Sequence, residues 1–123
     1  MPTDEPLFED PPRDVLLEAR AKVLHDLEVR GFADATVVSL LERTLDERRW
    51  WVEQWAEGAP FVPGLVAQDV QDTLLDSVGR WPSCRACGET AEHALCIEPP
   101  LGENPHWVCD EGGIVVAPLG SLP

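Results

Sequence analysis

Apolar residues recur every three or four positions through the first two thirds of the chain, a spacing typical of amphipathic helices. The first such stripe follows Asp10-Pro11-Pro12, which places an N-cap residue before two prolines suited to a first turn. It ends at Gly31, which suits the C′ position, and Phe32 is expected to pack back on Leu27 as in a Schellman ending. The stripe consists of Leu16, Ala19, Val23 and Leu27, widened by Leu17 and Leu24.

Two further helices are predicted before residue 80. One begins near Asp34 or Thr36 and ends at the Gly58-Ala59-Pro60 break, and its apolar side is formed by Val38, Leu41, Leu45, Val52 and Trp55. Residues 61–64 then form a loop. The last helix covers about residues 65–78, with Gly79 as its C-cap and with Val66, Val70, Leu74 and Val78 on one face.

Beyond residue 80, glycine and proline become frequent and the apolar segments become short. Residues 94–97, 107–108 and 114–117 are predicted strands, and residues 99–105 form the turn between the first two. The predicted fold class is therefore α+β, a three-helix bundle followed by a small β unit. We expect a flexible acidic N-terminus at 1–10, a helical domain at 11–79 and the β unit at 80–123.

The net charge of the chain makes some classes of binding partner less favourable than others. The chain of 123 residues carries 9 basic and 23 acidic side chains, a net charge of −14. Nucleic-acid binding proteins normally present basic surfaces, because neutralising phosphates supplies most of their affinity. Binding to nucleic acid or to an anionic membrane is therefore disfavoured, and an unknown, basic protein partner fits the charge better.

The predicted cellular compartment rests on the N-terminal residues and on the length of the apolar segments. The first 12 residues are acidic where a signal peptide would be basic, and no apolar run approaches the length of a membrane helix. We therefore expect a cytoplasmic protein. Four cysteines in a reducing compartment indicate metal or redox chemistry rather than structural disulfides.

Three of the cysteines have the spacing of a metal site. Cys84 and Cys87 lie three residues apart before Gly88, and two thiolates on such a turn can face one ion while the glycine lets the backbone reverse. Cys109 follows Trp107 at the end of a predicted strand. A tetrahedral site needs a fourth ligand.

Three residues are candidates for that fourth ligand. His93 lies six residues after Cys87. Cys96 lies three residues further along the same predicted strand and so points to the opposite face. His106 lies three residues before Cys109, also on the opposite face unless the chain turns there. The spacing alone leaves the choice open.

Residues 81–117 resemble a zinc ribbon. They contain, in order, a zinc knuckle (a turn with two cysteines), a strand, a turn, a second strand and a further cysteine. Gly112, however, stands where a ribbon has its fourth cysteine. The C-terminal pattern also resembles small uncharacterised actinobacterial proteins. The residues that match are Trp81, Pro82, Cys84, Cys87, Gly88, His93, Leu95, Trp107, Cys109, Val116, Ala117, Gly120 and Leu122, whereas Arg85 and Ala94 depart. This resemblance favours His93, so that Cys84, Cys87, His93 and Cys109 would hold a structural Zn²⁺, with Cys96 the leading substitute. It implies no activity.

Other functions are less well supported by the residues. A thioredoxin-like pair would lie at a helix N-terminus, which Gly88 opposes, and no zinc-deaminase, phosphate-loop or nucleophile-elbow motif is present. Trp50, Trp51 and Trp55 are expected partly in the core, sealing the helices against the β unit, and partly on a contact surface. We predict a non-enzymatic zinc protein acting as a protein-interaction module. A nucleic-acid-associated zinc ribbon and a thiol-redox or zinc enzyme are the alternatives.

Overall fold

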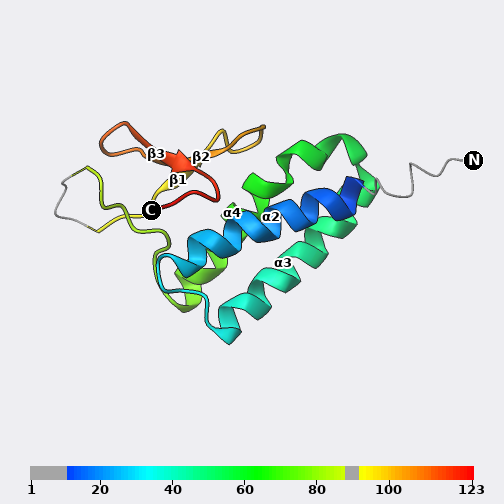
Figure 1. The fold of residues 1–123 in the computed structure, drawn as a ribbon, viewed down its shortest axis with the longest axis horizontal. Coiled ribbons are helices and arrows are strands. Elements are labelled where there is room, and N and C mark those ends of the chain that lie inside the picture. Colours follow the sequence, from blue (N-terminus) through cyan, green and yellow to red (C-terminus); the bar gives the residue numbers. More distant parts are fainter. Residues whose placement is uncertain (1–10, 88–91) are drawn as a thin grey trace, which may run out of the picture.

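A computed structural model describes residues 11–87 and 92–123, with side chains from residue 14 onward. Within these ranges, three α-helices are followed by a three-stranded antiparallel sheet, which confirms the predicted α+β class (Figure 1). The helices are α2 (Pro11–Glu28), α3 (Ala35–Gln54) and α4 (Val62–Ser77), with a 3₁₀ helix η1 (Ala56–Phe61) between the last two. The predicted mobile N-terminus and the Asp10 cap lie outside the described residues.

Helix α2 follows its apolar stripe. All four stripe residues from Leu16 to Leu27 are buried, whereas Leu17 is exposed, so that part of the prediction is wrong. Gly31 adopts a φ of +78°. The Phe32 amide donates to the Leu27 carbonyl at 2.9 Å, and the Gly31 amide to the Glu28 carbonyl at 3.0 Å. These two hydrogen bonds confirm the predicted Schellman ending.

Helix α3 begins where its cap predicts, because the Asp34 carboxylate accepts a hydrogen bond from the Val37 amide at 2.9 Å. Its buried face differs from the predicted one at the ends: Trp55 is exposed and Val38 is only half-buried. The buried side chains of this helix are Val37, Leu40, Leu41, Thr44, Leu45 and Val52.

Helix α4 begins earlier than predicted. Residues 62–64, expected in a loop, form its first turn and are buried, because Pro63 suits a helical first turn and η1 leads straight into it. At the other end the helix stops at Ser77, so Val78 falls outside it and is exposed. The Gly79 amide closes this end by donating to the Leu74 carbonyl at 2.7 Å, as the predicted glycine cap requires.

The three strands are β1 (Cys96–Glu98), β2 (His106–Cys109) and β3 (Ile114–Pro118), in the order β1-β2-β3. Cys96 pairs with Val108 and Ile97 with Trp107, while Cys109 pairs with Ile114 on the other side. The first strand thus begins two residues later and ends one residue later than predicted, and the first half of the predicted strand makes only an isolated bridge between Ser83 and Ala94.

The sheet packs on α4 through β1 and is joined to α2 by the Trp107 side chain of β2, and α3 lies on the far side of these two helices (Figure 1). One continuous apolar core joins the helices to the sheet. At the junction, the indoles of Trp81 and Trp107 meet edge to face at 5.3 Å, and both are fully buried. Leu119 and Leu122 complete this junction as the C-terminal residues return across it. The contacts that seal the sheet against the helices thus come from Trp81 and Trp107, not from the predicted tryptophans of α3.

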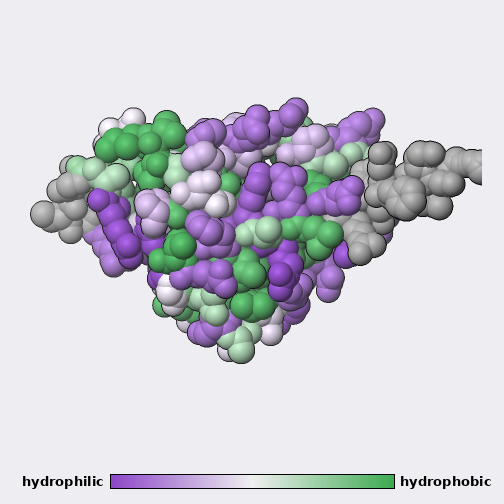
Figure 2. Space-filling model, in the orientation of Figure 1, coloured by the Kyte–Doolittle hydropathy of each residue, from purple (hydrophilic) through white to green (hydrophobic). Residues whose placement is uncertain are grey.

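Figure 2 shows hydrophilic side chains spread between apolar ones over one face of the molecule. None of the helices in the described part of the chain combines the length and apolar character of a membrane span.

Candidate metal centre

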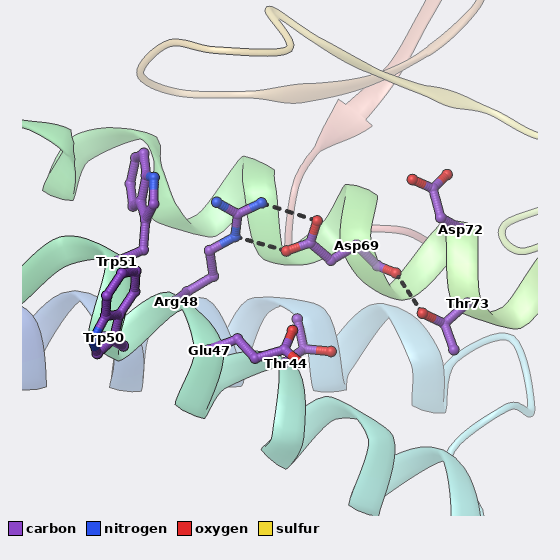
Figure 3. Close-up of a pocket in the computed structure, with 8 residues that line it drawn as sticks. All are labelled: Thr44, Glu47, Arg48, Trp50, Trp51, Asp69, Asp72 and Thr73. Atoms are coloured by element: carbon purple, nitrogen blue, oxygen red, sulfur yellow. Dashed lines mark hydrogen bonds and ion pairs between the residues drawn. The ribbon is translucent and has the colours of Figure 1, made fainter.

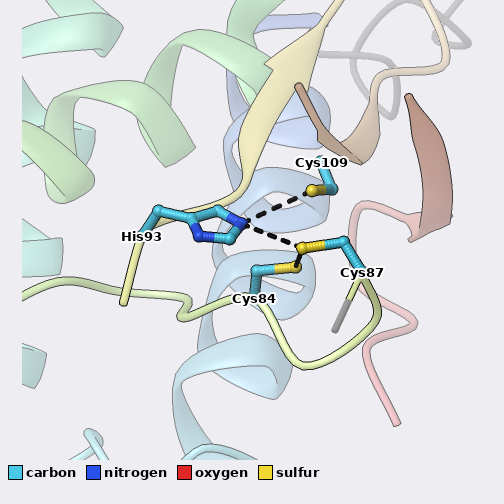
Figure 4. Close-up of side chains that lie close together, drawn as sticks. All are labelled: Cys84, Cys87, His93 and Cys109. Carbon is cyan, nitrogen blue, oxygen red and sulfur yellow. Dashed lines mark hydrogen bonds between the residues drawn. The ribbon is translucent and has the colours of Figure 1, made fainter. Parts of the chain in front are cut away.

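Four of the predicted ligands converge beside the sheet. The ligand atoms of Cys84, Cys87, His93 and Cys109 all lie within 4.8 Å of one another. Cys84 Sγ and Cys87 Sγ are 3.7 Å apart, and His93 Nε2 lies 3.5 Å from Cys87 Sγ and 3.4 Å from Cys109 Sγ (Figure 4). Three sulfurs and one imidazole nitrogen facing a common point could hold a metal ion.

The first pair of sulfurs comes from a turn. No helix includes residues 84–87, and the Ala86 amide points at Cys84 Sγ from 3.4 Å. This hydrogen bond is the main reason why the pKa of Cys84 is lowered to about 6, with smaller contributions from the Cys87 amide and the neighbouring thiols and an opposing one from burial. Cys84 is thus set up as a thiolate, the form that binds metals. Gly88, the knuckle glycine of the sequence prediction, lies outside the described residues.

The third sulfur comes from the end of β2. Cys109 is fully buried, and the Gly112 amide points at its sulfur from 3.2 Å. A Cβ atom at Gly112 would lie 2.8 Å from Cys87 Cβ, closer than two such atoms can approach. The position at which a ribbon carries its fourth cysteine therefore has no room for a side chain and contributes its amide instead.

His93 takes the fourth place because of a short stretch of β pairing. The Cys84 amide donates to the His93 carbonyl at 2.9 Å, and the Leu95 amide donates to the Pro82 carbonyl at 2.8 Å. These bonds flank the bridge between Ser83 and Ala94 and bring the histidine next to the cysteine turn. The two ends of the intervening segment are thereby held together.

The other two candidates lie outside this cluster. Cys96 Sγ contacts Asp110 Oδ2 at 3.3 Å, and burial, followed by this carboxylate, raises the pKa of Cys96 to about 11. His106 Nδ1 lies 2.8 Å from the Asn104 carbonyl. The structure therefore separates Cys96 and His106 from the residues that could share one ion.

A buried carboxylate holds the segment that ends in Cys109, together with the C-terminal residues, against α2. Asp26 is completely buried, and its Oδ2 accepts hydrogen bonds from the Trp107 indole at 2.8 Å and the Gly120 amide at 2.7 Å. Its Oδ1 accepts one from the Leu122 amide at 3.1 Å and lies 2.7 Å from His25 Nδ1. The four acceptor positions of the carboxylate are thus filled.

The end of α2 and the turn that follows it hold the first cysteine segment. The Trp81 indole donates to the Asp26 carbonyl at 3.1 Å, and Arg30 Nη1 donates to the Ser83 carbonyl at 2.8 Å. Burial, and then the nearby Arg85, lower the pKa of Arg30, while Asp26 and Cys84 oppose this shift. Helix α2 therefore contacts the segments that end in Cys84 and in Cys109.

Sequence reasoning missed Asp26 and gave no role to the indoles of Trp81 and Trp107. One signal was present: an acid three residues after Val23 and one before Leu27 lies on the apolar stripe of its helix. A charged residue on a buried face needs partners. Nothing local in the sequence indicates that those partners are an indole and two amides far along the chain.

The fold and cluster together define a small α+β protein with a Cys₃His centre that could bind a metal ion. The chain belongs to the family of the domain of unknown function DUF8819, which matches residues 12–119 and so includes both the helices and the cluster. No curated protein is significantly similar to the chain. No solved structure matches it either. The resemblances to zinc ribbons and to actinobacterial proteins stay predictions.

Proposed function

We propose that this protein is a non-enzymatic interaction module of the cytoplasm in which Cys84, Cys87, His93 and Cys109 hold one structural Zn²⁺. The observation that carries the metal proposal is the convergence of three sulfurs and one imidazole nitrogen within 4.8 Å. Tetrahedral zinc with bonds of about 2.3 Å to sulfur and about 2.0 Å to nitrogen separates two sulfurs by about 3.8 Å, and sulfur from nitrogen by about 3.5 Å. The sulfur–sulfur contact of 3.7 Å and the sulfur–nitrogen contacts of 3.5 and 3.4 Å agree with those values.

A structural rather than catalytic role is supported by the number of donors. Four protein ligands complete a tetrahedron, whereas catalytic zinc sites keep one position for water or substrate. The amides of Ala86 and Gly112 point at two of the sulfurs, an arrangement that stabilises bound thiolates. A redox role is opposed because Cys84 and Cys87 lie in a turn rather than at a helix N-terminus.

The interaction role is supported by the charge of the chain. A net charge of −14 opposes binding to phosphates and favours a basic protein partner. The four cysteines are not joined in disulfides, which fits the reducing conditions of the cytoplasm. Under this proposal the metal stabilises residues 81–117, and the partner binds elsewhere on the surface.

Metal analysis of the purified protein tests the zinc proposal, and the chain offers two matched control pairs. We expect a zinc-to-protein ratio near one in the wild type and in Cys96→Ser, and near zero in Cys84→Ser. His106→Ala should keep the metal that His93→Ala loses. The proposal is wrong if the wild type contains no zinc, or if both members of a pair retain it equally.

Chelation supplies a second readout. Binding of structural zinc to small domains contributes on the order of 10 kcal/mol, and this free energy is coupled to folding. Chelator should therefore remove amide-exchange protection from residues 81–117 while far-UV circular dichroism shows that the helices persist. Full protection of this segment in zinc-free protein would contradict a stabilising role for the metal.

A further inference from the structure

A groove between α3 and α4 has surface features that core packing does not explain. It has a volume of about 430 Å³ and is lined by Thr44, Glu47, Arg48, Trp50, Trp51, Asp69, Asp72 and Thr73 (Figure 3). Trp50, at one end, has 64% of its surface exposed. An indole carries 150–250 Å² of largely apolar surface by typical values, so leaving it in water is unfavourable unless a ligand covers it.

The charges of the groove are only partly balanced. Arg48 donates two hydrogen bonds to the Asp69 carboxylate, at 2.7 and 3.0 Å, and its guanidinium lies 5.2 Å from the centre of the Trp51 ring. This cation is therefore fully engaged within the protein. Within the described part of the chain, neither Glu47 nor Asp72 takes part in an ion pair or a side-chain hydrogen bond.

Arg43 lies one turn before Glu47 on α3, yet no ion pair of 4.0 Å or less joins them in the described residues. The groove thus contains three carboxylates and one engaged guanidinium, an excess of two negative charges. An exposed indole at one end of a groove that also contains unpaired carboxylates complements cations on apolar stems, because the ring attracts one cation and the carboxylates accept hydrogen bonds from others. Lysine and arginine side chains have this structure.

We propose that the α3–α4 groove binds a lysine- or arginine-rich segment of a protein partner, which lies along the groove with one basic side chain on Trp50 and others at Glu47 and Asp72. The occupant is a protein segment rather than a nucleic acid, because the groove and the chain as a whole repel phosphate. The net charge of −14 also steers a basic segment toward the protein. This inference rests on the interaction role proposed above and assigns it a surface separate from the metal centre.

The test is a calorimetric titration of the full chain with a capped hexa-arginine peptide at physiological salt. Two double variants remove the same amount of charge. One is Glu47→Gln with Asp72→Asn, in the groove. The other is Glu28→Gln with Glu103→Gln, two exposed acids that do not line it. We expect the groove double variant and Trp50→Ala each to weaken binding about tenfold, and the control double variant to change it less than about twofold.

Equal weakening by the two double variants would mean diffuse attraction to an acidic surface and would overturn the proposal. Absence of binding to the wild type would also overturn it. The chemical shift of the Trp50 indole N–H provides a local readout, and at a peptide concentration that half-saturates the control it should move much less in the groove double variant. Zinc analysis of the same samples separates the two proposals, since the groove variants should retain a ratio near one whatever the titration shows.

Discussion

Replacing Asp26 with alanine should destabilise the protein more than any other single change to a carboxylate in its described part. The substitution leaves three donors, the Trp107 indole and the Gly120 and Leu122 amides, without their acceptor. A buried donor without a partner costs about 1–3 kcal/mol, and the costs of neighbouring groups are not fully additive. We therefore expect a loss of about 3–5 kcal/mol, a large part of the 5–15 kcal/mol by which typical domains are stable.

Urea unfolding of the zinc-loaded protein measures this effect. With a slope of about 1.5–2 kcal/mol per molar urea, the expected loss lowers the midpoint by about 2 M. Asp26→Asn should also be destabilising, because its amide group turns one acceptor into a donor that faces the donors already present. Asp46→Asn on the exposed side of α3 is the matched control and should change stability by no more than about 0.5 kcal/mol.

A double-mutant cycle isolates the Asp26–Trp107 contact. Trp107→Phe keeps most of the ring and removes one hydrogen bond to a charged group, worth about 1.5–3 kcal/mol. If the contact is formed as the structure has it, the loss for Asp26→Asn with Trp107→Phe is smaller than the sum of the single losses. Additive losses, or an Asp26→Ala midpoint equal to that of the Asp46→Asn control, would refute the reasoning.

Two further outcomes test the metal centre itself. Gly112→Ala should lower the zinc affinity at least about tenfold, because its Cβ would lie 2.8 Å from Cys87 Cβ, and competition with a zinc indicator measures this affinity. Gly113→Ala is the control: its Cβ meets no atom within 4 Å, but its φ of +65° makes an alanine strained there. A larger loss of affinity in Gly112→Ala than in Gly113→Ala is therefore due to the contact with Cys87 and not to backbone strain. In zinc-loaded protein Cys96 should be the one thiol that iodoacetamide modifies, and its rate should rise about tenfold per pH unit between pH 8 and 10, because its pKa of about 11 keeps the thiol protonated there. Mass spectrometry reports which thiol is modified and how fast, and a rate that levels off near pH 9 would indicate that the pKa of Cys96 is not raised.

The helices could be predicted because their signals are local. Asp34 caps α3 through an amide three residues away, and Gly31 ends α2 through bonds that span a few residues. The errors in the predicted helix boundaries occur where contacts with residues distant in sequence decide whether a segment is helical. Residues 62–64 were predicted as part of a loop, but they are buried, with Gly64 against Ile97 and Pro105 of the β unit, and with the adjoining 3₁₀ helix this makes them the first turn of α4.

The Cys₃His cluster was predictable in part for the same reason. Cys84 and Cys87 form a local motif, whereas the place of His93, rather than Cys96, in the cluster depends on pairing between residues 82–84 and 93–95, which no local pattern specifies. Asp26 is the extreme case, since its partners lie 81, 94 and 96 residues further along the chain. Its sequence position signals only that a charge lies on a buried face.

The centre and Asp26 act on the same two chain segments. Each segment has a tryptophan followed two or three residues later by a cysteine: Trp81 before Cys84, and Trp107 before Cys109. Both indoles donate to Asp26, one to its carbonyl and one to its carboxylate, while both sulfurs face the shared cluster. Each segment is thus fixed to α2 near one end and meets the other segment at the opposite end. The helices therefore restrict where the sulfurs can lie. This lowers the loss of conformational entropy that would otherwise accompany metal binding when the sulfurs are brought together.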